Sequence, residues 1–125
     1  MKKRCCADGE MNLPDEVEQA LLSCGGLEVL RKALSTEEER VTEAARYEAL
    51  SDPKRLSILE SLQYCDLCPC IMREMTGLSD SKLSYHLKLL EEVGLVTWRQ
   101  SKNWRIYSLT PSGRIPLLML RSSNK

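Results

Sequence analysis

The fold of this chain is decided by one stretch, GLSDSKLSYHLKLLEEVGLVTWRQSKNWRIYSL, at residues 77–109. Its first half has a helical period, because Leu83, Leu87 and Leu90 recur at i, i+4 and i+7. Ser79 and Gly94 are residue types that begin and end helices. The second half has the composition of two short strands separated by the turn candidate SKN. The stretch therefore predicts a helix followed by a β-hairpin.

Further helices are predicted upstream of this stretch. CIMREMT is expected to be a short helix, since Pro69 suits a first helical turn and Gly77 suits a C-terminal end. Before it, SDP begins a helix whose Leu56, Leu59 and Leu62 face the core. Two short helices with a Gly-containing turn, followed by a hairpin, are typical of a winged helix-turn-helix. The predicted fold class is mainly α with a β-hairpin wing, that is, α+β.

The second of these helices carries a polar face suited to DNA. This face carries Ser81, Ser84, Tyr85 and Lys88 at i, i+3, i+4 and i+7. All four side chains can donate hydrogen bonds to phosphate oxygens and base edges. The hairpin adds cations, with no acid between Val96 and Leu109, and such a wing can hold the DNA backbone. The candidate DNA-binding residues are Ser79, Ser81, Lys82, Ser84, Tyr85, Lys88, Arg99, Lys102 and Arg105.

The charge distribution favours the same interpretation, although the net charge of the chain is zero. Residues 79–125 contain 8 Lys or Arg and 3 Asp or Glu. Residues 1–78 contain 10 Lys or Arg and 15 Asp or Glu. A basic C-terminal part can provide a local phosphate-binding surface. The competing interpretation is a solvated helix face with ordinary charge scatter, but the order and spacing of the elements favour DNA binding.

The length of 125 residues is that of one domain. We predict a single winged helix-turn-helix domain over residues 13–125, in which one helix begins at Ser35 and Pro116 is tolerated near the start of the last helix. The predicted parts are a flexible N-terminal arm at 1–12, N-terminal helices at 13–50, a DNA-binding core at 53–110 and a C-terminal helix at 111–125.

Three segments together resemble the ArsR/SmtB family of metal-responsive repressors. They are ALSDPKRLSILESL at 49–62, DLCPC at 66–70 and GLSDSKLSYHLKLLEEVGLVTWRQSKNWRIYSLTP at 77–111. The resemblance implies a homodimeric repressor that binds double-stranded operator DNA and releases it when an inducer binds. It also implies that the N-terminal helices and the last helix form the dimer interface.

The resemblance nominates cysteines as inducer ligands. DLCPC stands where the arsenic- and cadmium-sensing branches of the family have Glu-Leu-Cys-Val-Cys, which points to Cys68 and Cys70. The chemistry supports this independently, because Pro69 in a first helical turn places both thiols at a helix N-terminus, where exposed N–H groups favour thiolate. Thiolates bind soft ions.

Two thiolates are too few for such an ion, since As(III) or Sb(III) takes three and Cd(II) or Pb(II) takes three or four. Cys65 supplies a third, and its C-x-x-C spacing to Cys68 can hold one ion. The resemblance to the cadmium/lead branch of the family implies that Cys5 or Cys6 of the N-terminal arm can supply a fourth ligand. The candidate metal ligands are Cys65, Cys68, Cys70, Cys5 and Cys6, with As(III), Sb(III), Cd(II) or Pb(II) as inducer and no obligatory cofactor.

The same cysteines allow other interpretations. Structural zinc would need a fourth ligand, because closed zinc sites are usually tetrahedral. A disulfide between Cys65 and Cys68, or between Cys68 and Cys70, would make the protein a redox-sensing regulator. We do not expect an enzyme, because the C-x-x-C of thiol-disulfide enzymes belongs to a βαβ context. The last helix has no His, Asp or Glu, so the C-terminal zinc site of other family branches is not expected.

Two other residues were candidates for chemistry. Cys24 lies on the apolar face of a predicted helix and is expected in the core. His86 is the only histidine, and nothing near it completes a metal site, so we expect it to be packed or hydrogen-bonded.

The sequence contains no secretory signal and no apolar run near the roughly 20 residues that span a bilayer. We therefore expect a cytoplasmic protein with no membrane partner. Thiols stay reduced there, so six cysteines indicate metal or redox chemistry more than a disulfide framework.

Overall fold

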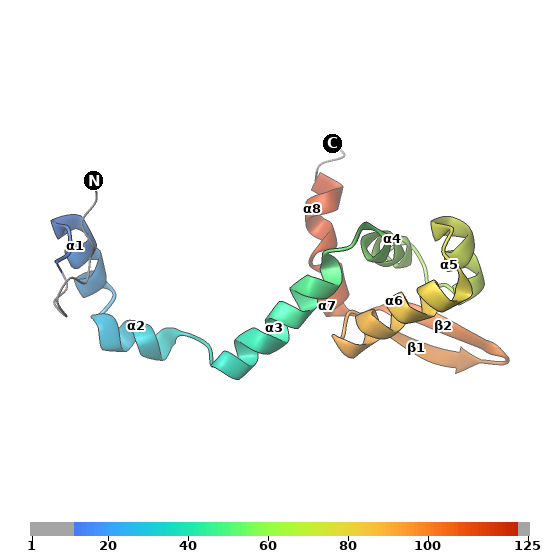
Figure 1. The fold of residues 1–125 in the computed structure, drawn as a ribbon, viewed down its shortest axis with the longest axis horizontal. Coiled ribbons are helices and arrows are strands. Elements are labelled where there is room, and N and C mark those ends of the chain that lie inside the picture. Colours follow the sequence, from blue (N-terminus) through green and yellow to red (C-terminus); the bar gives the residue numbers. More distant parts are fainter. Residues whose placement is uncertain (1–11, 123–125) are drawn as a thin grey trace. The chain divides into compact units, whose positions relative to one another are not determined.

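The computed structural model describes residues 12–122 (Figure 1). The chain divides into two compact units that meet between Glu37 and Glu38. The single domain expected over residues 13–125 stays a prediction, and each unit is described by itself. The arm predicted at 1–12 lies, apart from Asn12, outside the described residues.

The first unit contains two short helices, α1 (Asp15–Ser23) and α2 (Leu27–Ala33), joined through two glycines with positive φ. Acidic residues in the first turn of α1 suit the positive end of the helix dipole. Neither helix contains a buried residue. Cys24, which was expected in the core, is exposed. That prediction was wrong because α1 and α2 are the only described helices of this unit, and two short helices do not enclose a side chain between them.

The first four helices of the second unit are α3 (Glu37–Leu50), α4 (Pro53–Leu62), α5 (Pro69–Thr76) and α6 (Asp80–Glu92). As predicted, α4 begins with proline, and the Asp52 carboxylate caps it by accepting the N–H groups of Lys54 and Arg55. The helix expected to begin at Ser35 begins instead at Glu37. That start puts the run of acids in the first turn, where the dipole stabilises them.

A tight turn joins α5 to α6. Gly77 ends α5 in the left-handed conformation, with φ 73°, and its N–H donates to the Arg73 carbonyl at 2.8 Å. The Ser79 hydroxyl then caps α6 by accepting the N–H of Lys82. Both helix ends lie where the sequence predicts them.

Strands β1 (Val96–Ser101) and β2 (Trp104–Leu109) form the antiparallel hairpin, which lies against α6 (Figure 1). The register pairs Trp98 with Tyr107 and Arg99 with Ile106. Because side chains alternate along a strand, these two pairs lie on opposite faces of the hairpin. Lys102 takes a positive φ of 56° at the two-residue turn, as tight hairpin turns require.

The C-terminal segment differs from the prediction. One helix was expected over 111–125, but the described part forms two, α7 (Pro111–Arg114) and α8 (Leu117–Ser122). The interruption falls at Ile115 and Pro116, because proline has no N–H to continue the helical hydrogen bonds. Thr110 caps α7 by accepting the N–H of Gly113.

The core of the second unit draws on almost every element. Leu59 and Leu62 are buried as predicted, whereas Leu56 is only half-buried. The largest fully buried side chains are Ile58, Leu59, Met72, Leu83, Leu90, Leu95 and Leu117. This core fixes α5, α6 and the hairpin as a winged helix-turn-helix, which confirms the predicted fold class. Within residues 12–122, no helix combines the length and the apolar character that crossing a membrane requires.

Candidate nucleic-acid interface and cysteine cluster

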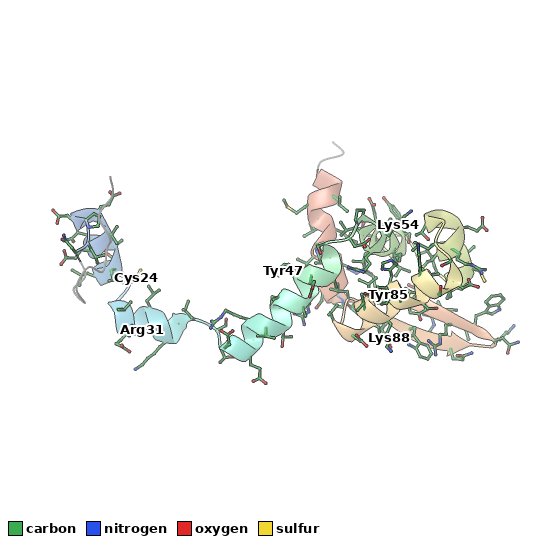
Figure 2. All side chains as sticks on the ribbon, viewed as in Figure 1. Cys24, Arg31, Tyr47, Lys54, Tyr85 and Lys88 are labelled. Atoms are coloured by element: carbon green, nitrogen blue, oxygen red, sulfur yellow. The ribbon has the colours of Figure 1, made fainter. Side chains whose placement is uncertain are left out.

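Helix α6 separates apolar from polar residues. Leu83, Leu87 and Leu90 are buried, whereas Ser81, Lys82, Ser84, Tyr85 and Lys88 are all exposed. Figure 2 shows Tyr85 and Lys88 projecting from this helix. The buried leucines thus hold the helix in place while its polar face stays accessible, which is the arrangement a recognition helix needs.

One face of the hairpin continues the polar face of α6. Ser84, Lys88 and Glu91 of α6 and three hairpin residues line a shared groove of about 420 Å³. In that groove the Arg105 guanidinium lies 3.9 Å from the centroid of the Trp98 ring, a cation–π contact. The Trp98 indole N–H donates to Glu91 at 2.9 Å. The ammonium of Lys88 and the guanidinium of Arg105 therefore border one groove between helix and wing.

The other wing cations lie elsewhere. Arg99 belongs to the opposite face of the hairpin, where its guanidinium pairs with Asp66 at 3.0 Å. Lys102 is at the hairpin tip, where its carbonyl accepts the side-chain amide of Gln100. The sequence predicts Arg99, Lys102 and Arg105 as one group of wing cations, because spacing alone does not say which strand face meets the helix.

The cysteine cluster stands where the sequence places it, at the start of α5. Cys68 is the N-cap residue with an extended backbone, Pro69 is the first helical residue, and Cys70 follows it. Cys68 and Cys70 are half-buried, Cys65 is exposed, and all three are free thiols.

A complete metal site is not assembled in the described part of the chain. No group of three or more His, Cys, Asp or Glu side chains among residues 12–122 is gathered in a way that could hold an ion. Cys5 and Cys6, the arm candidates, lie outside the described residues. The five-cysteine ligand set stays a prediction.

Sequence reasoning missed how the cysteine loop is attached to the wing. Leu67 forms a β-bridge with Tyr107, through N–H to carbonyl distances of 3.1 and 2.8 Å. Beside it, side-chain hydrogen bonds from Arg99 and Ser108 hold the pKa of Asp66 below its usual range. These partners are more than 30 positions apart in the chain, so no local pattern announces them.

The cysteine loop and the wing also share a groove of about 490 Å³. Its lining is mostly apolar and includes two thiols and one carboxylate, from Asp66, Leu67, Cys68, Cys70, Ile71, Trp104 and Ile106. Cys68 and Cys70 therefore line a groove that they share with Trp104 and Ile106 of the wing, on the hairpin face that carries Arg99.

His86 is hydrogen-bonded, as predicted. Its Nδ1 lies 2.9 Å from the Arg55 guanidinium, which also donates to the Ala49 carbonyl at 2.6 Å. Arginine has only donors, so Nδ1 acts as the acceptor. This network joins the end of α3, the start of α4 and α6.

Comparison with known proteins agrees with this geometry. Residues 52–97 match the model of the bacterial regulatory protein, arsR family. The chain belongs to the arsR family. The matched segment runs from the cap of α4 into β1, so it contains the cysteine loop and the whole of α6.

Two arsenical resistance operon repressors and one solved structure are among the proteins to which the chain is similar. The chain is 40% identical over 65 residues to the arsenical resistance operon repressor of Bacillus subtilis (strain 168), covering 51% of this chain and 62% of that protein. It is 43% identical over 60 residues to the repressor of that name in Staphylococcus xylosus, covering 48% and 58%. The crystal structure of NolR from Sinorhizobium fredii matches with a TM-score of 0.63 at 34% identity, covering 72% of this chain and 92% of that one. The chain thus spans about three fifths of the length of these curated relatives.

Proposed function

We propose that this arsR-family chain is a transcriptional repressor that binds operator DNA as a homodimer and is released when a soft metal or metalloid binds its cysteine cluster. The observation that carries the DNA-binding part is the exposed polar face of α6, held on buried leucines and continued by Arg105 of the wing. A regulator of operator DNA works where the DNA is, so the proposal includes a cytoplasmic location, where the free thiols stay reduced.

The polar face of α6 supplies both kinds of contact that a DNA reader needs. Ser84 and Tyr85 offer hydroxyl groups to base edges and phosphates, and the ammonium of Lys88 attracts the backbone. Ser79 is already occupied with capping α6, so its contribution would be to fix the helix start near a phosphate. Lys82, in the first turn of α6, adds a cation beside that start.

The inducer site would be built on Cys68 and Cys70. The helix start presents both residues, and their soft thiolates prefer As(III), Sb(III), Cd(II) or Pb(II) over hard ions. The names of the Bacillus and Staphylococcus relatives favour an arsenical. Cys65 would complete a three-thiolate site, and Cys5 or Cys6 would add a further ligand. Structural zinc at these cysteines is the competing use.

The homodimer is supported by apolar side chains left uncovered on the second unit. Ile115, Leu118 and Met119, around α8, are each at least 64% exposed, and Val41 and Tyr47 on α3 are each at least 60% exposed. Exposed apolar side chains gathered on terminal helices are typical of a surface that a second subunit covers.

The test of the DNA-binding part is the salt dependence of operator binding. Lys88→Ala should weaken binding and lower the slope of log K against log[salt] by about 1, because one phosphate contact is lost. Lys32→Ala is the matched control, since Lys32 is an exposed lysine of α2 outside the winged unit. Equal slopes for wild type and Lys88→Ala would show that α6 does not meet the phosphate backbone in this way.

A further inference from the structure

The loop that carries the cysteines is connected to the wing by two kinds of contact. One is the main-chain bridge between Leu67 and Tyr107. The other is the ion pair between the Asp66 carboxylate and the Arg99 guanidinium, 3.0 Å apart, with Ser108 Oγ 3.4 Å from the same guanidinium nitrogen. The loop thus extends the hairpin sheet along its β2 edge.

The alternation of side chains decides what shares each face of this extended sheet. Leu67 lies opposite Tyr107, so its neighbours Asp66 and Cys68 project to the other face. That other face of the hairpin carries Arg99 and its cross-strand partner Ile106. The groove lined by both Cys68 and Ile106 agrees with this assignment. A ligand on the cysteines and the cation of the wing therefore belong to the same side of the sheet.

Asp66 has a special position in this arrangement, because it lies between two candidate ligands, Cys65 and Cys68. An ion held by both thiolates would close a small ring of chain that contains Asp66, and ring closure restricts the backbone of the residues inside it. Restricting Asp66 changes where its carboxylate can meet Arg99. The ion pair is also exposed, at 58% and 45% for its two side chains, so it contributes little to folding and its loss should leave the fold intact.

We propose that Asp66 is the positioning residue that transmits occupancy of the cysteine cluster to the wing, through its ion pair with Arg99. This inference rests on the proposed function and adds a route to it. In the ion-free protein the pair holds Arg99 and the wing in the DNA-binding geometry. Ion binding displaces the carboxylate, and the wing loses that geometry, so DNA affinity falls. Arg99 would then act as a regulated wing residue, and Lys88 and Arg105 as the cations of the α6 groove.

The experiment compares wild type with Asp66→Asn, Asp66→Glu and Glu43→Gln. Asn keeps the size of the side chain and removes its charge, and Glu keeps the charge. Glu43→Gln is the matched control, because it removes another ion pair, with Arg46 on α3. For each protein, operator affinity is measured without an ion and with saturating arsenite or, separately, Cd(II). Ion binding itself is followed by thiolate absorbance.

In wild type and Glu43→Gln, the ion should lower operator affinity by about tenfold or more, in the usual range of allosteric coupling. In Asp66→Asn the ion-induced loss of operator affinity should shrink by at least about threefold. The ion affinity of this variant should stay within about threefold of wild type. Asp66→Glu should restore the coupling between ion binding and operator affinity. An unchanged loss in Asp66→Asn would overturn the coupling role and leave the proposed function standing. If wild type keeps its operator affinity with either ion bound, both the coupling role of Asp66 and the proposed function are overturned.

Amide hydrogen exchange gives a second readout that does not involve DNA. Ion binding should change the protection of the Leu67 and Tyr107 amides in wild type, since both donate across the bridge. In Asp66→Asn this change should extend less far into the hairpin. Identical hairpin exchange in wild type with and without the bound ion would contradict transmission through the wing.

Discussion

At the scale of single residues, Asp52 shows how one side chain fixes a helix start. Burial raises the pKa of its carboxyl, but the N–H groups of Arg55 and Lys54 and the charge of Arg55 lower it more, so the net direction is downward. Arg55, whose side chain is only 11% exposed, lies 3.9 Å from this carboxylate and also contacts His86. The cap therefore stabilises the fold in its charged form.

Asp52→Asn tests this at two pH values. Asn can still cap a helix, so only the charge is lost, and the variant should be less stable by about 0.5–1 kcal/mol at pH 7. A carboxyl with a lowered folded pKa contributes stability above its unfolded pKa of about 3.9 and loses it as the pH falls through the folded pKa. The difference between the two proteins in the free energy of urea unfolding should therefore shrink as the pH is lowered from about 7 through the unfolded pKa toward the lower folded pKa. If the free energies of unfolding of wild type and Asp52→Asn differ by the same amount at neutral and at acidic pH, the charge of Asp52 does not stabilise the fold.

At the scale of elements, the start of α7 packs closely against the segment that precedes the wing. Gly113 is buried, and a Cβ at this position would collide with the Leu95 carbonyl oxygen and the Leu109 side chain. Thr110, which caps α7, donates its hydroxyl to the Gly94 carbonyl at 2.6 Å. The first turn of α7 thus closes the base of the hairpin.

Gly113→Ala should destabilise the protein by about 1–3 kcal/mol, because backbone must shift to admit the methyl group. Chemical denaturation measures the loss. Ser112→Ala is the neighbouring control and should stay within about 0.5 kcal/mol of wild type. A Gly113→Ala protein as stable as wild type would mean that α7 can move away from Leu95 without cost.

Local sequence signals predict the elements better than the contacts between them. The leucine period, Ser79 and Gly77 place α6 and the preceding turn, because helix ends depend on neighbouring residues. The bridge from Leu67 to Tyr107 depends on the whole fold, so the sequence offered no signal for it. The sequence predicts one helix that tolerates Pro116, whereas Pro116 separates two helices in the structure. The split shows that its missing N–H outweighs the apolar pattern around it.

At the scale of the whole molecule, the proposed dimer depends on the apolar surface around α8. Leu118 is 64% exposed on the described chain, so a charge there would be tolerated in a monomer and disfavoured in an apolar interface. Leu118→Glu should therefore keep its helical circular dichroism, sediment as a monomer and lose operator affinity. Met75→Glu, at a similarly exposed residue of α5, is the control and should stay dimeric. A Leu118→Glu protein that remains a dimer would place the interface elsewhere.

The central claim is that an ion on the cysteine cluster controls DNA binding, and one titration tests it most directly. Operator affinity of the reduced protein is measured with arsenite, Cd(II), Zn(II) and peroxide in separate series, for wild type and for Cys68→Ser/Cys70→Ser. We predict that a soft ion releases DNA from wild type and not from the variant, because the variant lacks the two thiolates at the start of α5. Release by peroxide alone would make the same cysteines a redox switch. Operator binding that ignores all four additions would contradict the account.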